Sequence, residues 1–263
     1  MAQCRNNLKQ LGIAFHNYHD NFTCLPSGWI GVDLASGEPD PYGTTGFGWG
    51  AMLLPYIEQA PLYNQFDFGK TINDYSTTPI NNQSLLATKL SSFTCPSERD
   101  DGNWTVTHAY TQQNIALVAS CNYIGVYGTQ DYFCGPIGTS CVGQGPLYHN
   151  SRVRIGEIQD GTSHSIILLE RRNDALNSWY GNSVRGTWAG AIPEAVDVLE
   201  VFSSEIDEGP NGVIEDEDLG SYHSSACNFL FCDGHVQSIQ TGIDINILKA
   251  LATISGAEST GEF

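Results

Sequence analysis

The chain has few basic residues and little charge of any kind. Of its 263 residues, 11 are Lys or Arg and 29 are Asp or Glu, which gives a formal net charge of −18. Because binding to nucleic acid or to anionic lipid needs clustered Lys and Arg, the composition argues against both as partners. Charged residues make up 15% of the chain, against roughly 25% in ordinary soluble proteins. The surface must therefore depend on uncharged polar residues and Gly.

Membrane-length apolar runs and familiar catalytic motifs are also missing. No apolar run reaches the roughly 18 residues of a membrane span, and no signal peptide is visible. The chain contains no GxSxG, no HExxH and no phosphate-binding Gly-rich loop. Ser163 and His164 are adjacent, but neighbouring side chains on a strand face opposite ways, so we expect no nucleophile–base pair there. The sequence therefore predicts a protein that is not an enzyme.

The eight cysteines contain no CxxC pair, which argues against a closed zinc site formed by local spacing. An even number of cysteines favours disulfides and an oxidising compartment; the alternative is buried free thiols in a cytosolic protein. Cys134 and Cys141 are the best candidates for a disulfide, since they lie close in sequence across a turn. Cys227 and Cys232 should not pair with each other, because they point to opposite faces of one predicted strand.

The N-terminal segment has the apolar spacing of a helix. Residues 1–24 are predicted to be helical, with apolar side chains at intervals of four and three residues. These side chains form a seam of Cys4, Leu8, Leu11, Phe15, Tyr18 and Phe22. No Ser, Thr, Asp or Asn cap precedes the seam, so we expect the helix to continue upstream in a longer precursor. The alternative is a helix that begins at an initiator Met.

The rest of the chain predicts one α+β domain, because no repeat and no long linker divides it. After the helix at 1–24, we expect a body of sheet and loops at 25–220 and a hairpin with a C-terminal helix at 221–263. Within the body, residues 24–50 predict ordered loop with short strands and 50–68 two helical pieces broken by proline. Further predicted elements are a helical segment at 84–90, a strand at 122–128, and a strand SIILLE buried on both faces after a turn at Asp160-Gly161.

The C-terminal region gives the clearest local pattern. Two apolar runs flank Asp233-Gly234, which predicts a hairpin with a two-residue type I′ turn. Such a turn pairs Cys232 with His235 and Phe231 with Val236. Residues 243–254 predict a final helix, with Asp244 as its N-cap and Gly256 as its stop.

Several blocks occur in an order that resembles a known family. QCRNNLKQLGIAFHNYHD, GWGAMLLPYIEQAPLYNQFDF, SFTCPS, NYIGVYG, IQDGTSHSIILLE and the H-x9-DG motif, here His223 to Asp233 and Gly234, are similar to the planctomycete-type prepilin-like proteins. That family is described as a domain of unknown function and also carries a solute-binding-like label. The resemblance covers nearly the whole chain. Ser224, Ser225 and Ala226 replace the family's usual small residues after the motif histidine.

The resemblance implies a pilin-like fold, with a long N-terminal helix packed on a mainly antiparallel sheet, large loops and a short C-terminal helix. It also implies that a prepilin leader and a hydrophobic half-helix precede the QCxNNLKQLG segment in the precursor. Any contact with a membrane would then run through this upstream helix alone. These expectations agree with the seam that lacks a cap.

Two groups of residues are candidate metal ligands. His223, Asp233 and His235 carry donors that suit a divalent ion, but we favour a structural role for the motif residues His223, Asp233 and Gly234, with Asp233 and Gly234 shaping the turn and His223 fixing the preceding loop. The base-free acidic stretch 200–218 partly matches a calcium loop. Its candidate ligands are Asp207, Asn211, Val213 (through its carbonyl), Glu215 and Asp218, with Gly209 a mismatch. The alternative is a solvated acidic loop.

The glycosylation sequons and the tryptophans do not point to a specific function. Asn21, Asn82 and Asn103 begin glycosylation sequons, which in a bacterial chain we attribute mostly to chance. The tryptophans at 29, 49, 104, 179 and 188 could stack on a sugar or on a neighbouring subunit, but core or loop-anchoring positions explain them equally.

These observations favour an exported structural subunit of a pilin-like extracellular or cell-surface filament, or of a secretion-system pseudopilus. Its partners would be copies of itself or other pilin-like subunits, with the helix seam Leu8, Leu11, Phe15, Tyr18 and Phe22 at the packing surface, and Ca2+ the one candidate cofactor. The alternative is a monomeric surface module that binds a carbohydrate or another small solute in a concave pocket.

Overall fold

The computed structural model describes residues 1–41, 45–76, 81–98, 102–108, 111, 113–129, 134–171, 173, 186–192, 221–223, 226–240 and 242–256. Its strands form two sheets rather than the one expected. The smaller sheet has the order β1-β2-β5 and the larger one the order β3-β4-β6-β7. Every pairing between these strands is antiparallel. The α+β, helix-on-antiparallel-sheet class predicted from the sequence is confirmed.

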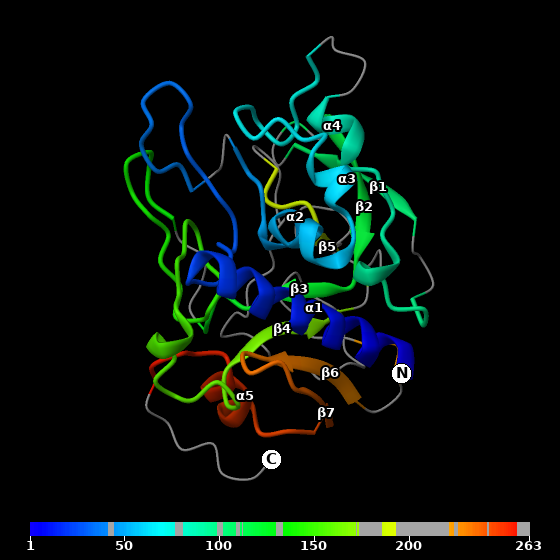
Figure 1. The fold of residues 1–263 in the computed structure, drawn as a ribbon, viewed down its shortest axis with the longest axis vertical. Coiled ribbons are helices and arrows are strands. Elements are labelled where there is room, and N and C mark those ends of the chain that lie inside the picture. Colours follow the sequence, from blue (N-terminus) through cyan, green and yellow to red (C-terminus); the bar gives the residue numbers. More distant parts are fainter. Residues whose placement is uncertain are drawn as a thin grey trace.

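Most helical elements precede the strands along the chain, while η3 lies between β3 and β4 and α5 follows the last strand. The helical elements are α1 (Ala2–Phe22), α2 (Trp49–Leu53), η1 (Leu54–Ile57), α3 (Ala60–Tyr63), α4 (Asn82–Leu85), η2 (Ser91–Phe93), η3 (Ile155–Glu157) and α5 (Ile245–Leu251). The strands are β1 (Asn103–Thr107), β2 (Asn114–Cys121), β3 (Tyr123–Gly125), β4 (Ile166–Glu170), β5 (Gly186–Thr187), β6 (Ala226–Phe231) and β7 (Val236–Gln240). Figure 1 shows the smaller sheet with α3 and α4 at one end of the molecule and α5 at the other.

Helix α1 forms because its apolar residues recur at helical spacing and can all face one sheet. Leu8 and Leu11 have no exposed surface and Phe15 is 2% exposed, so these three lie in the core that α1 shares with the larger sheet. The helix approaches the sheet most closely at Gly12, where an added Cβ would meet the Leu230 side chain at 2.9 Å. The seam thus packs inside this chain as far as Phe15.

The seam ends in an aromatic group at the surface. Tyr18 is half-buried and its ring lies 4.5 Å from that of Phe22 and 5.9 Å from that of Tyr56. Phe22 is 56% exposed. Of the predicted seam, only this last turn is open to a neighbouring molecule.

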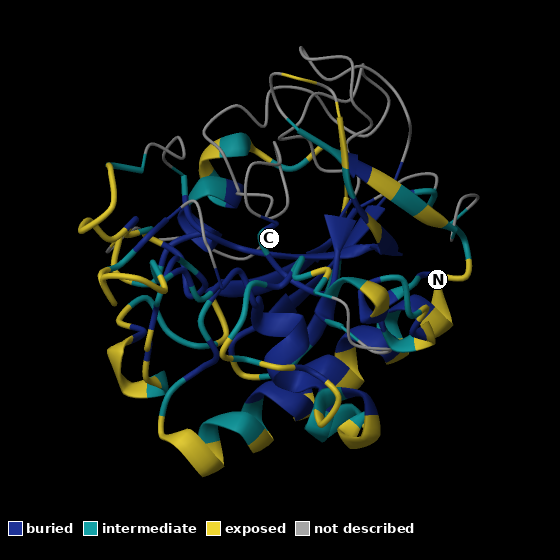
Figure 2. Ribbon diagram, turned by 90° about the horizontal axis from the view of Figure 1, so that it is seen from above, coloured by how far each residue is buried: buried dark blue, intermediate teal, exposed yellow. Residues whose placement is uncertain are grey.

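The larger sheet is covered on both faces, since side chains alternate along a strand. On β6, Leu230 belongs to the core beneath α1, whereas Phe229 and Phe231 belong to a second core with Leu248 and Leu251 of α5. Strand β4 is buried along its whole length, as its continuous apolar sequence predicts. Figure 2 shows these buried strands and helices at the centre, with exposed segments around the rim.

Asp244 caps α5 as predicted, by accepting a hydrogen bond from the backbone N–H of Asn246 at 2.8 Å. The 50–68 region differs from the expectation in number of pieces. Three short helices, α2, η1 and α3, occur there, with Pro55 and Pro61 in the first turns of the second and third. Proline is favoured at such positions because the first-turn N–H groups have no partner within the helix. The predicted short strands at 24–50 are single bridges, such as Trp29 with Gly48.

The predicted hairpin exists, but its predicted register is wrong by one residue. Leu230 pairs with Val236, and the N–H of Phe231 bonds to the carbonyl of His235 at 3.0 Å. The loop therefore has three residues, Cys232 to Gly234, with Gly234 at φ 87°. A type I turn followed by a left-handed glycine is the usual solution for a three-residue hairpin loop, and an Asp-Gly pair fits it as well as a type I′ turn.

Replacing Gly234 with Ala should destabilise the protein by about 1–2 kcal/mol, because a Cβ is strained in the left-handed region. Gly242→Ala is the matched control, since an added Cβ there meets nothing within 4 Å. Urea unfolding of both variants measures the difference. Equal effects would show that the hairpin glycine is not needed for its conformation.

Candidate functional site

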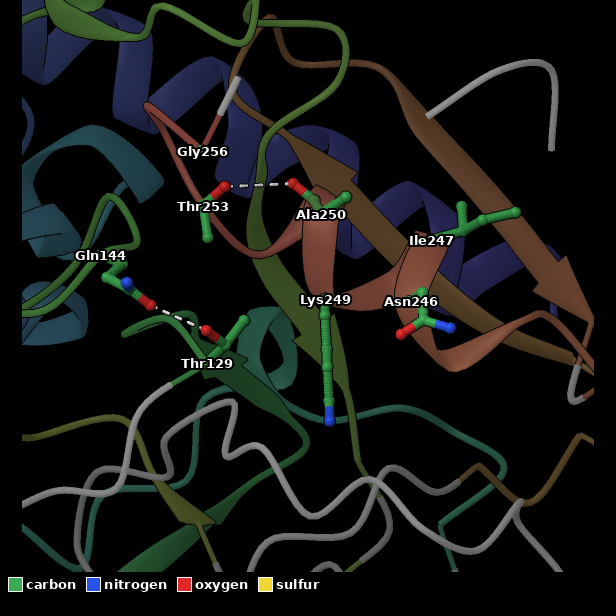
Figure 3. A pocket seen from close by; sticks show the side chains of 8 residues that line it. All are labelled: Thr129, Gln144, Asn246, Ile247, Lys249, Ala250, Thr253 and Gly256. Carbon is green, nitrogen blue, oxygen red and sulfur yellow. Dashed lines mark hydrogen bonds between the residues drawn. The ribbon is translucent and has the colours of Figure 1, made fainter. Parts of the chain in front are cut away.

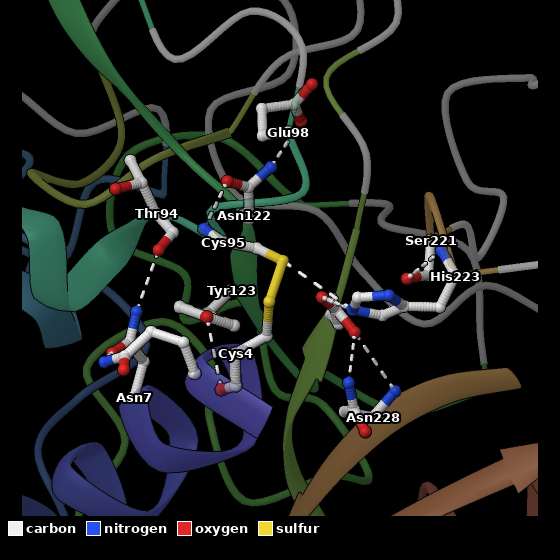
Figure 4. Close-up of a disulfide and its surroundings, with 12 residues drawn as sticks. Cys4, Asn7, Thr94, Cys95, Glu98, Asn122, Tyr123, Ser221, His223 and Asn228 are labelled. Atoms are coloured by element: carbon white, nitrogen blue, oxygen red, sulfur yellow. Dashed lines mark hydrogen bonds and ion pairs between the residues drawn. A yellow bond between two sulfur atoms is a disulfide. The ribbon is translucent and has the colours of Figure 1, made fainter. Parts of the chain in front are cut away.

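The first turn of α1 is joined covalently to the segment after η2. Cys4 and Cys95 form a disulfide across 91 residues of sequence, and both are at most 5% exposed. Asn7, one turn further along α1, donates to the carbonyls of Ser91 and Thr94 at 2.9 and 2.8 Å. Figure 4 shows the disulfide and the contact of Asn7 with Thr94. The sequence pattern placed Cys4 in the seam but gave no pairing for it, because its partner is remote in sequence.

Asn122 holds the other half of the disulfide in place. It is the residue between β2 and β3, where the chain passes from the smaller sheet to the larger one. Its side-chain oxygen accepts the N–H of Cys95 at 2.9 Å, and its amide nitrogen donates to Glu98 at 2.5 Å and to the carbonyl of Arg171 at 3.0 Å. Cys95 is therefore fixed at the junction of the two sheets.

A buried carboxylate and an imidazole lie beside the disulfide. Glu170, at the end of β4, is 2% exposed, and its Oε1 lies 3.3 Å from Nε2 of His223. The same Nε2 lies 3.7 Å from Sγ of Cys95. The other carboxylate oxygen of Glu170 accepts from the backbone N–H and the Nδ2 of Asn228 at 3.3 and 2.6 Å. Burial raises the pKa of Glu170, while His223 and Asn228 oppose that shift.

Together, Cys4, Cys95, Glu170 and His223 place their donor atoms within 4.8 Å of one another. We call these four residues the disulfide–carboxylate cluster. The sequence predicted Glu170 only as the end of an apolar strand and not as a site residue. A glutamate that directly continues a fully buried strand is the one available signal, because a buried carboxylate needs partners.

The motif residues His223, Asp233 and His235 do not come together. His223 precedes β6, and Asp233 lies beyond its other end; a strand rises about 3.3 Å per residue, so β6 holds them roughly 16 Å or more apart. Asp233 instead accepts from Nδ1 of His235 at 2.6 Å, and the His235 ring stacks on Phe231 at 4.2 Å. These three residues therefore do not form one metal site.

The disulfide predicted between Cys134 and Cys141 is confirmed. The predicted calcium ligands Asp207, Asn211, Val213, Glu215 and Asp218 lie outside the described residues, so the calcium site stays a prediction. Three of the tryptophans, Trp29, Trp49 and Trp188, are at most 3% exposed and belong to the core.

The expectation that Ser163 and His164 lie on a strand and face opposite ways is wrong. They lie in a turn rather than on a strand, and the Ser163 hydroxyl is 3.1 Å from Nδ1 of His164. In a turn, adjacent side chains can converge, which a strand forbids. Both residues are exposed, so water competes for the hydroxyl.

A separate pocket of about 420 Å³ lies beside α5. It is lined by Thr129, Gln144, Asn246, Ile247, Lys249, Ala250, Thr253 and Gly256. Figure 3 shows that Thr129 and Gln144 are joined by a hydrogen bond, which measures 2.7 Å. The lining has no aromatic side chain on which a sugar ring could stack.

Within the described ranges, no helix combines the length and apolar character needed to cross a membrane. The architecture is that of an α+β domain with a long N-terminal helix that packs on an antiparallel sheet and is joined to the segment after η2 by a buried disulfide.

The family model described as "Protein of unknown function (DUF1559)", labelled SBP_bac_10, matches residues 1–246. The chain belongs to this family, as its sequence blocks predicted. No curated protein and no solved structure matches it.

Removing the Cys4–Cys95 link should cost more stability than removing the Cys134–Cys141 link. The first closes a loop of 91 residues and the second one of 7; chain entropy alone predicts losses of about 4–5 and about 2–3 kcal/mol. Urea unfolding of the Cys4→Ala/Cys95→Ala and Cys134→Ala/Cys141→Ala variants compares them. A larger loss for the second pair would contradict the assignment of Cys4–Cys95 as the main covalent constraint.

Asn228→Ala should cost about 1–3 kcal/mol, because it leaves a buried carboxylate without its closest donor. Asn246→Ala is the control, since Asn246 donates in the same way to Asp244 at 3.0 Å but is exposed. Thermal and urea unfolding should show little change for the control. Similar losses in both variants would mean that burial of Glu170 does not matter.

Proposed function

We propose that the chain is an exported, non-catalytic subunit that assembles with copies of itself or with related pilin-like subunits into an extracellular or cell-surface filament or a pseudopilus. The observation that supports this proposal most is helix α1. It is a 21-residue amphipathic helix, and its seam packs on the chain's own sheet as far as Phe15. Such a helix is held as a rigid element along the domain, and its remaining surface is open for contacts between subunits.

Two separate apolar positions on α1 support a head-to-tail contact. Ile13 is 55% exposed on the face opposite the sheet, and Phe22 is 56% exposed at the end of the seam. A polymer that continues indefinitely needs two different surfaces that fit each other, since a single self-complementary surface closes into a dimer. The proposal pairs the Ile13 face of one copy with the aromatic group of Tyr18, Phe22 and Tyr56 on the next.

Covalent structure supports export. Two disulfides, Cys4–Cys95 and Cys134–Cys141, join segments of this chain, and structural disulfides persist in oxidising compartments. A net charge of −18 makes copies repel one another at low ionic strength, and salt or divalent cations screen that repulsion. Assembly should therefore strengthen as salt rises.

No observation on the described residues specifically supports the alternative, a module that binds a carbohydrate or another small solute. The described residues that line the pocket beside α5 include no aromatic side chain, and Trp29, Trp49 and Trp188 are buried. A carbohydrate site in this pocket would need an exposed ring as a platform.

Ile13→Asp should abolish assembly while leaving the melting temperature within about 2 °C of wild type, because Ile13 is a surface position. Leu34→Asp is the matched control, since Leu34 is 50% exposed but lies in a turn outside α1. Sedimentation velocity across a salt series and negative-stain microscopy of cell-surface material measure the outcome. A strictly monomeric wild-type chain at every salt concentration, or a loss shared equally by both variants, would refute the proposed contact.

A further inference from the structure

The disulfide–carboxylate cluster contains the donors of a metal site drawn from four separate segments. Cys4 comes from α1, Cys95 from the segment after η2, Glu170 from β4 and His223 from the segment before β6. Their donor atoms lie within 4.8 Å of one another, and the side chains of Glu170 and His223 are 2% and 7% exposed. Spacing in the sequence excluded a local zinc motif, but it cannot exclude a site assembled by folding.

Two of the distances between the donors already fit a tetrahedral ion, whereas the two sulfur atoms, which are bonded to each other, must separate on reduction. Zinc–sulfur bonds of about 2.3 Å and zinc–nitrogen or zinc–oxygen bonds of about 2.1 Å place sulfur and nitrogen ligands about 3.6 Å apart, and nitrogen and oxygen ligands about 3.4 Å apart. In the structure, Sγ of Cys95 lies 3.7 Å from Nε2 of His223. That nitrogen lies 3.3 Å from Oε1 of Glu170. Both distances match edges of such a tetrahedron.

Surrounding hydrogen bonds orient the carboxylate donor. Asn228 holds one oxygen of Glu170 through two bonds, and the other oxygen faces His223. Ser238 in turn donates to Asn228 at 2.6 Å, and the backbone N–H of His223 donates to the Ser221 hydroxyl at 3.1 Å, which holds the main chain of His223. Such outer partners characteristically fix carboxylate ligands around metals.

A plain His–carboxylate pair explains part of this arrangement but not the sulfur atoms. The exposed pair Asp233–His235 forms with a distance of 2.6 Å and needs no cysteine. In the cluster, by contrast, the same imidazole nitrogen faces both a carboxylate and a sulfur. A buried carboxylate is costly without a strong cation, and a divalent ion would supply one.

We propose that reduction of the Cys4–Cys95 disulfide converts this cluster into a binding site for one thiophilic, tetrahedral divalent cation of the Zn2+ class. The disulfide and the metal complex are alternative states of one site, because the same two sulfur atoms make either the S–S bond or the metal bonds. Two thiolates, one imidazole and one carboxylate are soft and borderline donors that suit Zn2+ rather than Ca2+.

The disulfide is converted into the metal complex in two steps. A phosphine reductant and one water convert the disulfide into two thiols and a phosphine oxide, so the two electrons come from phosphorus. Binding of the cation then releases one proton from each thiol, and the imidazole binds in its neutral form. Both states tie α1 to the segment after η2, so the metal would hold the helix in place where a reductant keeps the disulfide open.

The test uses the full chain with Cys24→Ser, Cys134→Ser and Cys141→Ser, which removes the other thiols that a metal could reach; Cys24 is half-buried, and the remaining Cys121, Cys227 and Cys232 are buried. The chain is reduced with the phosphine under anaerobic conditions and titrated with Co2+ and then Zn2+. We expect one ion per chain, tetrahedral cobalt absorption with a thiolate charge-transfer band, and displacement of cobalt by zinc. The oxidised chain should show neither band.

His223→Gln and Glu170→Gln should each weaken binding by about tenfold or more, since each removes or weakens a ligand. His235→Gln is the matched control and should bind within about twofold of the parent. Melting temperatures of the oxidised variants check that they fold. If the reduced chain unfolds without metal, Zn2+ must refold it and raise its melting temperature.

Four outcomes would overturn the proposal: a reduced chain that binds no cobalt through thiolate, a reduced chain that Zn2+ cannot refold, equal binding by the oxidised chain, or binding unchanged in both ligand variants. None of these outcomes bears on filament assembly, which is measured with the disulfide intact.

Discussion

The packing of α1 against the larger sheet is the constraint on which the rest of the molecule depends. The helix can lie close to β6 because Gly12 leaves room for Leu230, and its seam then fills the core shared by both sheets and the short helices. Nonpolar burial alone would allow the helix to slide along its axis, because contacts between apolar side chains have little directionality. The Cys4–Cys95 bond and the two hydrogen bonds of Asn7 remove that freedom.

Polar groups at the junction of the two sheets complete this arrangement. Asn122 is fully buried, and its side chain satisfies the backbone of Cys95 and of Arg171. Glu170 and Asn228 bond across β4 and β6 on the same side. Buried polar groups are tolerated only when their hydrogen bonds are satisfied, so this network specifies how the two sheets meet. A purely apolar junction would have allowed several relative arrangements of the two sheets.

Features with a local period could be predicted from the sequence, whereas features that depend on remote partners could not. The spacing of Leu8, Leu11 and Phe15 sufficed for α1, and the Asp244 cap sufficed for the start of α5. Strands β1 and β2 were missed, since an edge pairing with mixed burial leaves no clean alternation. The disulfide Cys4–Cys95 and the role of Glu170 depend on four segments meeting, and no spacing encodes that. The hairpin register failed because Asp-Gly suits two loop lengths.

The position of the Cys4–Cys95 bond also decides how the domain would respond to mechanical force. A subunit held in a polymer through its N-terminal helix would be pulled at that helix, and α1 would otherwise peel from the sheet one turn at a time. With the bond at the first turn of α1, the start of the helix stays joined to the segment that Asn122 anchors between the two sheets. A load applied at Ile13 or Phe22 therefore cannot separate the first turn of α1 from the junction of the two sheets without breaking this bond.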